Sequence, residues 1–217
     1  MRSRYNETVA EAVPRLILAS ASPRRRALME NLGVPFSVVP SRVEEEPRPG
    51  EPFRSFVRRA ARDKGEEVAG RHPESYVLSA DTVVVAGGRM LGKPTSRSDA
   101  ARMLGMLQGR EHRVHTAVWL LRKAARYADS AVVTTRVFFR PLAPEEIRAY
   151  LRTGEGDDKA GAYAAQGRGT LLIERIVGSY SNVVGLPMTT VFGMLAGAGL
   201  VAVSRSGPEW YRLRRRR

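Results

Sequence analysis

The stretch LILASASPRRRALMENL, from Leu16 to Leu32, constrains the fold most strongly, because its hydrophobic pattern changes halfway along. The first residues are continuously apolar, as in a buried strand. In the second half, leucine and methionine residues recur three or four positions apart, as on one face of a helix. Between the halves, Ser22 suits the N-cap of a helix and Pro23 its first turn. The stretch therefore predicts a strand that leads directly into a helix.

The start of this predicted helix is a candidate anion site. Free backbone N–H groups and the helix dipole attract negative charge there. Three arginines, Arg24, Arg25 and Arg26, follow at once, and the hydroxyls of Ser20 and Ser22 lie nearby. Because cations are disfavoured at this end of a helix, the cluster predicts a phosphate ligand; the alternative is a capped helix with a solvated basic first turn. Successive helical residues are about 100° apart, so we expect Arg26 to face solvent.

The rest of the chain alternates strands with helices and then forms a long hairpin. Strands are predicted at residues 15–20, 35–40, 76–86, 89–91, 112–122, 130–140 and 171–177; helices are predicted at 22–33, 51–70, 98–107, 145–152 and 189–198. Ser98 or Asp99 is the expected N-cap of the third helix. This order is typical of an α/β fold in which helices cover both faces of a mixed sheet.

Length and composition fit one domain. A chain of 217 residues that is 43% hydrophobic can bury a sizeable core. The absence of cysteine excludes disulfides and cysteine-ligated metals. No run approaches the roughly 20 apolar residues of a membrane span, and the first residues lack the apolar centre of a signal peptide, so we expect a cytoplasmic protein with no membrane partner. We predict an N-terminal extension at residues 1–13, a single domain at 14–200 and a mobile basic tail at 201–217.

Asp81 is the most informative single residue, because it interrupts the apolar run Tyr76–Ala86. Burying a carboxylate is costly unless it is paired or bound to a cation. A metal ligand or general base at the carboxyl end of a strand is one interpretation; an aspartate that caps a turn is the other. Glu44 and Glu45 offer further carboxylates, and Mg²⁺ needs only one or two. Their alternative is a surface acidic loop.

Lysines add to the candidate anion site. Lys64 lies on a predicted helix, Lys93 between a glycine and a proline, and Lys159 after two aspartates. Each taken alone is typical of a solvated lysine. Together with the arginines after Pro23 they could surround several phosphates, where Lys acts as a point charge and Arg as a fork.

Other chemistries are not indicated. His112 and His115 are three apart on a predicted strand and therefore point to opposite faces, so we expect separate surface or hairpin roles and no metal pair. The chain lacks a GxxxxGK[ST] phosphate-binding loop. The net charge of +14, with six arginines and one glutamate in residues 205–217, raises nucleic-acid binding as an alternative. Because the few aromatic residues show no stacking pattern among the basic ones, we expect no nucleic-acid partner.

Several motifs in one order resemble those of the Maf family of nucleoside triphosphate pyrophosphatases. The matching stretches, within residues 16–195, are Ser20-Ala21-Ser22-Pro23-Arg24-Arg25, Glu44-Glu45, Ala80-Asp81-Thr82, Gly92-Lys93-Pro94, Asp158-Lys159-Ala160-Gly161-Ala162-Tyr163, Gln166-Gly167 and residues 178–187, GSYSNVVGLP.

This resemblance implies a fold and an activity. The fold would be α/β of the Maf and ITPase-like type, an elongated mixed β-sheet flanked by helices, with two lobes and a cleft between them. Residues 14–200 would form the catalytic domain. The activity would be hydrolysis of a nucleoside triphosphate by water attack at the α-phosphate, which releases the monophosphate and pyrophosphate. The resemblance also implies a divalent metal cation, Mg²⁺ or Mn²⁺, and a homodimer.

The resemblance assigns roles to particular residues. Asp81 would be the catalytic residue and, with Glu45, a metal ligand. The substrate-binding residues would be Ser20, Ser22, Arg24, Arg25, Lys64 and Lys93. Base specificity would depend on Arg24, Thr82 and Gln166, which match the type that acts on dTTP and UTP; the type that prefers 7-methyl-GTP has Gln in place of Thr82. A Gln amide offers a donor and an acceptor, as the O4/N3–H edge of uracil and thymine requires.

The resemblance leaves two alternatives open, one on the shape of the base pocket and one on the activity. The pair Ala164-Ala165 stands where a Gly-Ile pair is common in the family, so the shape of the base pocket could differ. The alternatives to a dTTP/UTP enzyme are a pyrophosphatase for a different or modified nucleotide, and a nucleic-acid-binding or division-regulating protein that uses its basic surface.

Overall fold

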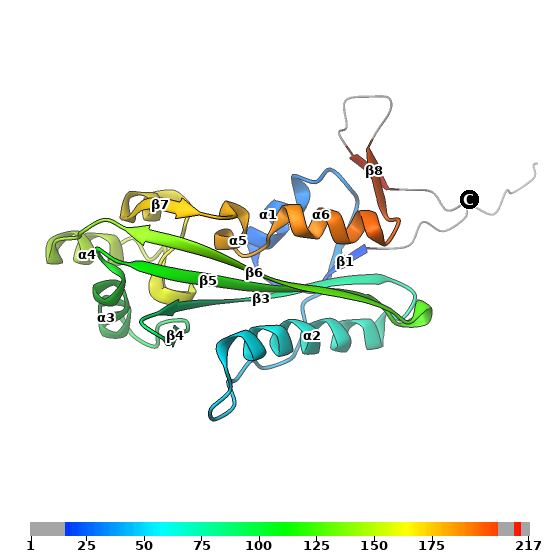
Figure 1. The fold of residues 1–217 in the computed structure, drawn as a ribbon, viewed down its shortest axis with the longest axis horizontal. Helices are drawn as coiled ribbons and strands as arrows, with labels where there is room; N and C mark the ends of the chain where they lie inside the picture. The colour runs from blue at the N-terminus through cyan, green and yellow to red at the C-terminus, as the bar shows by residue number, and fades with distance from the viewer. Residues whose placement is uncertain (1–15, 204–210, 214–217) are drawn as a thin grey trace, which may run out of the picture.

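The computed structural model describes residues 16–203 and 211–213 (Figure 1). The predicted N-terminal extension at 1–13 and the last four arginines of the predicted tail lie outside the described residues. No helix in the described part of the chain is long and apolar enough to cross a membrane.

The elements follow one another as a mixed α/β chain. The strands are β1 (Leu16–Leu18), β2 (Ser37–Val38), β3 (Tyr76–Ala86), β4 (Arg89–Leu91), β5 (Glu111–Arg122), β6 (Tyr127–Phe139), β7 (Ile173–Val177), β8 (Val201–Val203) and β9 (Tyr211–Leu213). The helices are α1 (Pro23–Glu30), α2 (Phe53–Arg71), α3 (Arg97–Leu107), α4 (Pro144–Leu151), α5 (Tyr180–Val184) and α6 (Met188–Gly197), with 3₁₀ turns η1 (Lys123–Ala125), η2 (Ala160–Ala162) and η3 (Gly167–Leu172).

Seven strands form one mixed sheet in the order β2-β1-β3-β5-β6-β7, with β4 also paired to β3. β1 runs parallel to β2 and β3, and the remaining pairs are antiparallel. The long hairpin of β5 and β6 extends along the molecule (Figure 1). The predicted α/β fold with a mixed sheet is confirmed; the division into two lobes stays a prediction.

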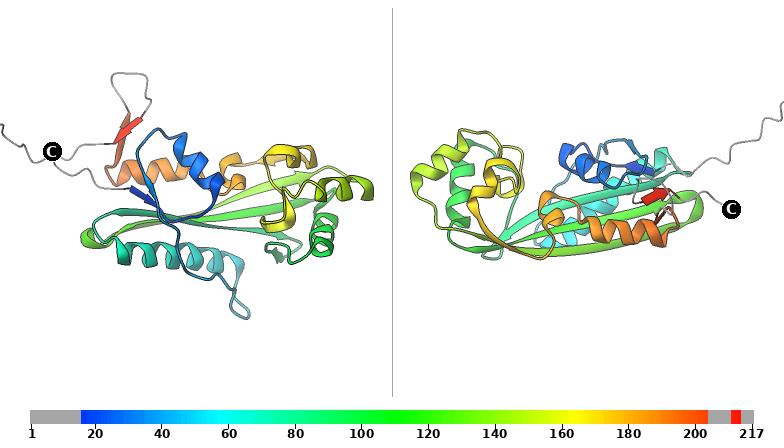
Figure 2. Two further views of the ribbon diagram at one scale, coloured as in Figure 1. Left: turned by 180° about the vertical axis from the view of Figure 1, so that it is seen from behind. Right: turned by 90° about the horizontal axis from the view of Figure 1, so that it is seen from above.

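Helices cover both faces of this sheet, as the alternation of side chains requires. Ile17 points to the face covered by α2, where it joins a core with Val68. Leu16 and Leu18 point the other way and pack with Met29 of α1. Figures 1 and 2 show α2 on one side of the sheet and α1, α5 and α6 on the other, with α3 and α4 together at one end.

One edge of β3 is open for several residues in the middle of the strand. The pairing of β1 with β3 ends at Leu18 and Leu78, and the pairing of β4 begins only at Val84. Across the intervening residues, β5 is the one strand of the described chain that pairs with β3. Because side chains alternate along a strand, Asp81 and Thr82 face opposite sides of the sheet, yet both are accessible from the gap.

The structure corrects several expectations from the sequence. Asp81 lies in the middle of β3 and not at its carboxyl end, because β3 continues as the antiparallel partner of β5. Ser96, and neither Ser98 nor Asp99, caps α3. Residues 171–172 belong to η3 instead of the following strand. The predicted tail is not wholly mobile, since β8 and β9 pair in a separate two-stranded sheet.

The predicted surface position of the two strand histidines is also wrong. Both are buried, although on opposite faces as expected. His112 Nε2 lies 2.8 Å from Tyr163 Oη, and burial lowers the pKa of His112 to about 4. His115 Nδ1 lies 2.8 Å from Thr134 Oγ1, and its ring packs on Phe53 of α2. The two histidines therefore serve the core as neutral rings.

Candidate functional site

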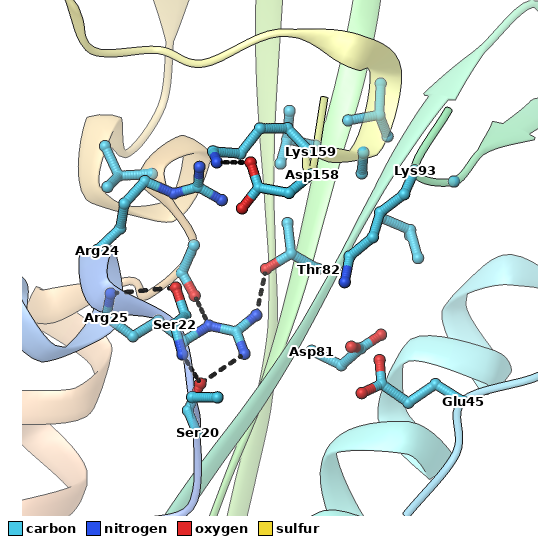
Figure 3. A pocket seen from close by; sticks show the side chains of 18 of the residues that line it. Ser20, Ser22, Arg24, Arg25, Glu45, Asp81, Thr82, Lys93, Asp158 and Lys159 are labelled. Carbon is cyan, nitrogen blue, oxygen red and sulfur yellow. Dashed lines mark hydrogen bonds and ion pairs between the residues drawn. The ribbon is translucent and has the colours of Figure 1, made fainter. Parts of the chain in front are cut away.

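A cavity of about 1310 Å³ opens at the unpaired edge of β3. Its wall includes every residue to which the sequence assigned a site role: Ser20, Ser22, Arg24, Arg25, Glu45, Lys64, Asp81, Thr82, Lys93 and Gln166. The close view in Figure 3 shows the arginines of α1 on one side and the carboxylates of Asp81 and Glu45 on the other. Segments far apart in the sequence thus meet around one space.

The acidic side of the cavity is built around an ammonium group. Lys64 Nζ of α2 lies 2.8 Å from Asp81 Oδ1 and is also ion-paired with Glu45. Asp81 is 5% exposed and Lys64 8% exposed, so both charges are almost wholly removed from water. The predicted phosphate ligand Lys64 therefore contacts carboxylates here, and it compensates charges that would otherwise be costly to bury.

The two carboxylates differ in how readily they ionise. Burial, and a hydrogen bond with Asp81, raise the pKa of Glu45 above its usual range. Burial also opposes ionisation of Asp81, but the charges of Lys64 and Arg25 and the hydrogen bonds from Glu45 and Lys64 together hold the pKa of Asp81 below its usual value. Asp81 is therefore the member of the pair that ionises first.

This pair suits a hard divalent cation. In the described part of the chain no third histidine or carboxylate joins them as a metal cluster. Mg²⁺ is commonly bound by one or two carboxylates, with substrate phosphates and water completing its shell. The contact of a positively charged ammonium with both carboxylates shows that this point of the cavity favours a cation.

The neighbouring arginines of α1 have different surroundings. The guanidinium of Arg25 donates to Gly185 O (2.8 Å), Ala80 O (2.7 Å) and Thr82 Oγ1 (3.0 Å). Ala80 is a residue of the open edge of β3, so Arg25 supplies the donor that a neighbouring strand would otherwise supply. Arg25 thus joins α1, β3 and the turn after α5 (Figure 3).

The guanidinium of Arg24, by contrast, is not held by hydrogen bonds of this kind. Its Nε and Nη1 are shielded from solvent and have no hydrogen-bond partner among the residues that the structure describes. Burial lowers the pKa of Arg24, and the charge of Asp158, which it faces across the cavity in Figure 3, opposes this effect. Buried donors without a partner are rare in proteins and indicate a missing acceptor. Arg26 points outward and pairs with Glu30, which confirms the prediction that it faces solvent.

The start of α1 follows the predicted pattern. Ser22 Oγ accepts a hydrogen bond from Arg25 N at 3.4 Å, and Pro23 occupies the first turn. Ser20 Oγ accepts from Ser22 N at 3.2 Å. These bonds align the helix start with the cavity.

Thr82 and Gln166, the two residues predicted to contact the base, differ in how far the protein itself uses their hydrogen-bonding groups. Thr82 Oγ1 lies 3.0 Å from Thr116 Oγ1 and accepts from Arg25. Thr116 Oγ1 in turn donates to Asn182 O at 3.1 Å. Gln166 is exposed at the rim of the cavity, and its side chain makes no hydrogen bond within the described residues.

Two acidic residues of the cavity were missed by the sequence reasoning. Asp158 faces Arg24 and is ion-paired with Lys159, and Glu155 lines the wall near Gln166. Both lie in the glycine-rich segment TGEGDDKAG, where carboxylates are typical of a solvated loop. The motif around Lys159 was the only signal that could have drawn attention to them.

Comparison with known proteins gives consistent matches over most of the chain. A family model described as Maf-like protein matches residues 15–198. The dTTP/UTP pyrophosphatase of Syntrophomonas wolfei is 48% identical over 184 residues, which cover 84% of this chain and 96% of the relative. The dTTP/UTP pyrophosphatase of Myxococcus xanthus is 48% identical over 185 residues, or 85% of this chain and 93% of the relative. The protein of the same name from Deinococcus radiodurans is 45% identical over 193 residues, or 89% and 97% of the two chains.

Proposed function

The chain belongs to the Maf-like protein family, and from this premise we propose that it hydrolyses dTTP and UTP to the nucleoside monophosphate and pyrophosphate. The observation that carries the proposal is the buried carboxylate Asp81, held by Lys64 across a cavity from unpartnered arginine donors. Such an arrangement suits phosphoryl transfer, which depends mainly on positioning and on neutralising charge.

The triphosphate would lie between the start of α1 and the carboxylates. Arg24 supports this placement because its buried Nε and Nη1 find no acceptor within residues 16–203 and 211–213. Lys93 points into the same space in Figure 3 and makes no hydrogen bond or ion pair within the described residues. The Ser22 hydroxyl and the N–H of Arg24 add neutral donors, since Pro23 has no N–H and the N–H groups of Arg25 and Arg26 donate to Ser22. Arg25 would act by holding this wall in place, since its guanidinium already donates to the protein.

The reaction requires a nucleophile at the α-phosphorus. Asp81, the more readily ionised carboxylate, is the group that would accept or orient the proton of the attacking water. Glu45 and Asp81 would hold a divalent cation, Mg²⁺ or Mn²⁺, which when bound activates water and neutralises phosphate charge. Lys64, fixed between the two carboxylates, keeps Glu45 close to the buried Asp81.

The direction of the hydrogen bonds from Thr82 to Thr116 and from Thr116 to Asn182 supports a base that carries a donor at N3. Thr116 uses its proton on Asn182 O, so it accepts from Thr82. Thr82 therefore has no proton left and offers only an acceptor lone pair to a ligand. Uracil and thymine carry N3–H, whereas cytosine does not. Gln166, whose amide makes no hydrogen bond in the described part of the chain, would complete the contact at the base edge.

A panel of nucleotides tests this proposal. With Mg²⁺ or Mn²⁺ present, we expect kcat/KM for UTP and dTTP to exceed that for CTP, ATP and GTP by at least roughly tenfold, since a site that leaves a polar group unpaired loses affinity by that order or more. Chelation of the metal should abolish turnover with every nucleotide. Equal rates across the panel, or a preference for a purine, would contradict the pyrimidine assignment.

A further inference from the structure

Glu155 holds the loop that carries Gln166. Its Oε1 accepts a hydrogen bond from Arg168 N at 3.0 Å, and its Oε2 accepts from Gly169 N at 3.0 Å. These two consecutive N–H groups lie in the first turn of η3, where they have no partner within the turn. One carboxylate therefore fixes the two residues that follow Gly167.

The backbone packs so closely around this contact that Gly167 and Gly169 leave no room for a side chain. Gly167 has a φ of +63°, and a Cβ there would lie 2.9 Å from Glu155 Oε1. A Cβ on Gly169 would lie 1.9 Å from Ala164 O. The carboxylate thus sits against the chain on one side of Gln166, and the loop closes on itself around it.

Two tyrosines hold the other side of the loop. Tyr150 Oη accepts from Ala164 N at 3.0 Å. Tyr180 Oη donates to Ala165 O at 3.3 Å. Gln166 is therefore bracketed by side-chain contacts to the backbone, although its own side chain is exposed and makes no hydrogen bond in the described part of the chain. The position of its amide depends on these contacts.

We propose that Glu155 is a positioning residue that sets the choice of base by fixing the loop of Gln166. This inference rests on the proposed function, since it assigns a purpose to the predicted base contact. Glu155 lines the cavity, but both of its oxygens are used by backbone donors, so it acts through the loop. It takes no part in the group of Lys64, Glu45 and Asp81.

The substitution Glu155→Gln tests the inference, because the amide places an N–H group where one backbone N–H needs an acceptor. The ratio of kcat/KM for UTP to that for CTP is expected to fall roughly tenfold, while kcat for UTP stays within about twofold of wild type. Glu174→Gln is the matched control, since Glu174 is exposed on β7 and makes no hydrogen bond or ion pair within the described residues. An unchanged ratio in active Glu155→Gln enzyme would overturn the inference.

A double-mutant cycle separates positioning from general stability. If Glu155 acts through Gln166, Glu155→Gln should leave the ratio unchanged when Gln166→Ala is already present. The inference would be overturned if the two substitutions lowered the ratio additively. It would also be overturned if Glu155→Gln lowered kcat/KM for UTP and for CTP equally. Should Glu155→Gln fail to fold, Tyr180→Phe loosens the same loop at Ala165 and should lower the ratio about threefold. Absence of UTP hydrolysis by the wild type would refute the proposed function instead, whatever the variants do.

Discussion

Asp81→Asn is expected to reduce kcat/KM for UTP by at least about 100-fold. The substitution keeps the size of the side chain but removes the negative charge and the ability to accept a proton. Asp81 is the carboxylate whose pKa lies below its usual value, so it stays ionised at neutral pH. Steady-state release of pyrophosphate measures the effect.

The fold should tolerate this change. An Asn oxygen can still accept from Lys64, and Glu45 keeps the ammonium paired. The matched control is Asp129→Asn, at an exposed position on β6, which should retain the wild-type rate. A near-normal rate in correctly folded Asp81→Asn would remove Asp81 from the reaction.

Lys64→Met is expected to have a second large effect, on stability as well as on activity. It removes the cation that lies between the buried carboxylate of Asp81 and the more exposed carboxylate of Glu45, and it leaves the two carboxylates facing each other. Breaking a buried ion pair in this way lowers the free energy of unfolding by about 3 kcal/mol. We also expect a loss of roughly 100-fold in kcat/KM for UTP, as for removal of a fixed stabilising group. Urea unfolding and steady-state rates measure the two effects.

Added Mg²⁺ tests whether the loss of stability in Lys64→Met comes from the carboxylates of Glu45 and Asp81. Mg²⁺ should restore more of the free energy of unfolding in Lys64→Met than it adds to wild type, because the carboxylates of Glu45 and Asp81 then lack the ammonium that contacts them both in wild type. The control is Lys123→Met, which removes an exposed pair with Glu66 and should cost no more than about 1 kcal/mol. Wild-type stability in Lys64→Met would show that the buried pair contributes nothing to the fold.

The sequence could predict the local features of this protein well. The strand-to-helix stretch depends on residues that are close in sequence, so Ser22 and Pro23 mark the start of α1 correctly. The strand Tyr76–Ala86 was predicted at its observed bounds, because a β-branched run that ends at a Gly-Gly turn leaves little ambiguity. The motifs also named residues that meet in one cavity.

Features that depend on contacts between distant segments could not be predicted. Arg24 and Arg25 look equivalent in the sequence. Only the carbonyls of Ala80 and Gly185, 55 and 160 residues from Arg25, distinguish the buried anchor from the arginine with free donors. Similarly, nothing local shows that Lys64 would pair with Asp81 across the gap between α2 and β3.

The position of Asp81 within its strand illustrates the same limit. Its access to the cavity depends on where β1 stops and where β4 begins to pair, and neither boundary is encoded near Asp81 itself. Glu155 was overlooked for a related reason. A carboxylate between glycines is typical of a solvated loop, and its contacts with Arg168 and Gly169 appear only once the loop closes.

Hydrolysis of UTP in ¹⁸O-labelled water tests the central claim most directly. Mass spectrometry of the products locates the oxygen that the attacking water contributes. If water held near Asp81 attacks the α-phosphorus, the label appears in UMP and the pyrophosphate stays unlabelled. Label in pyrophosphate, or formation of UDP and inorganic phosphate, would contradict the account.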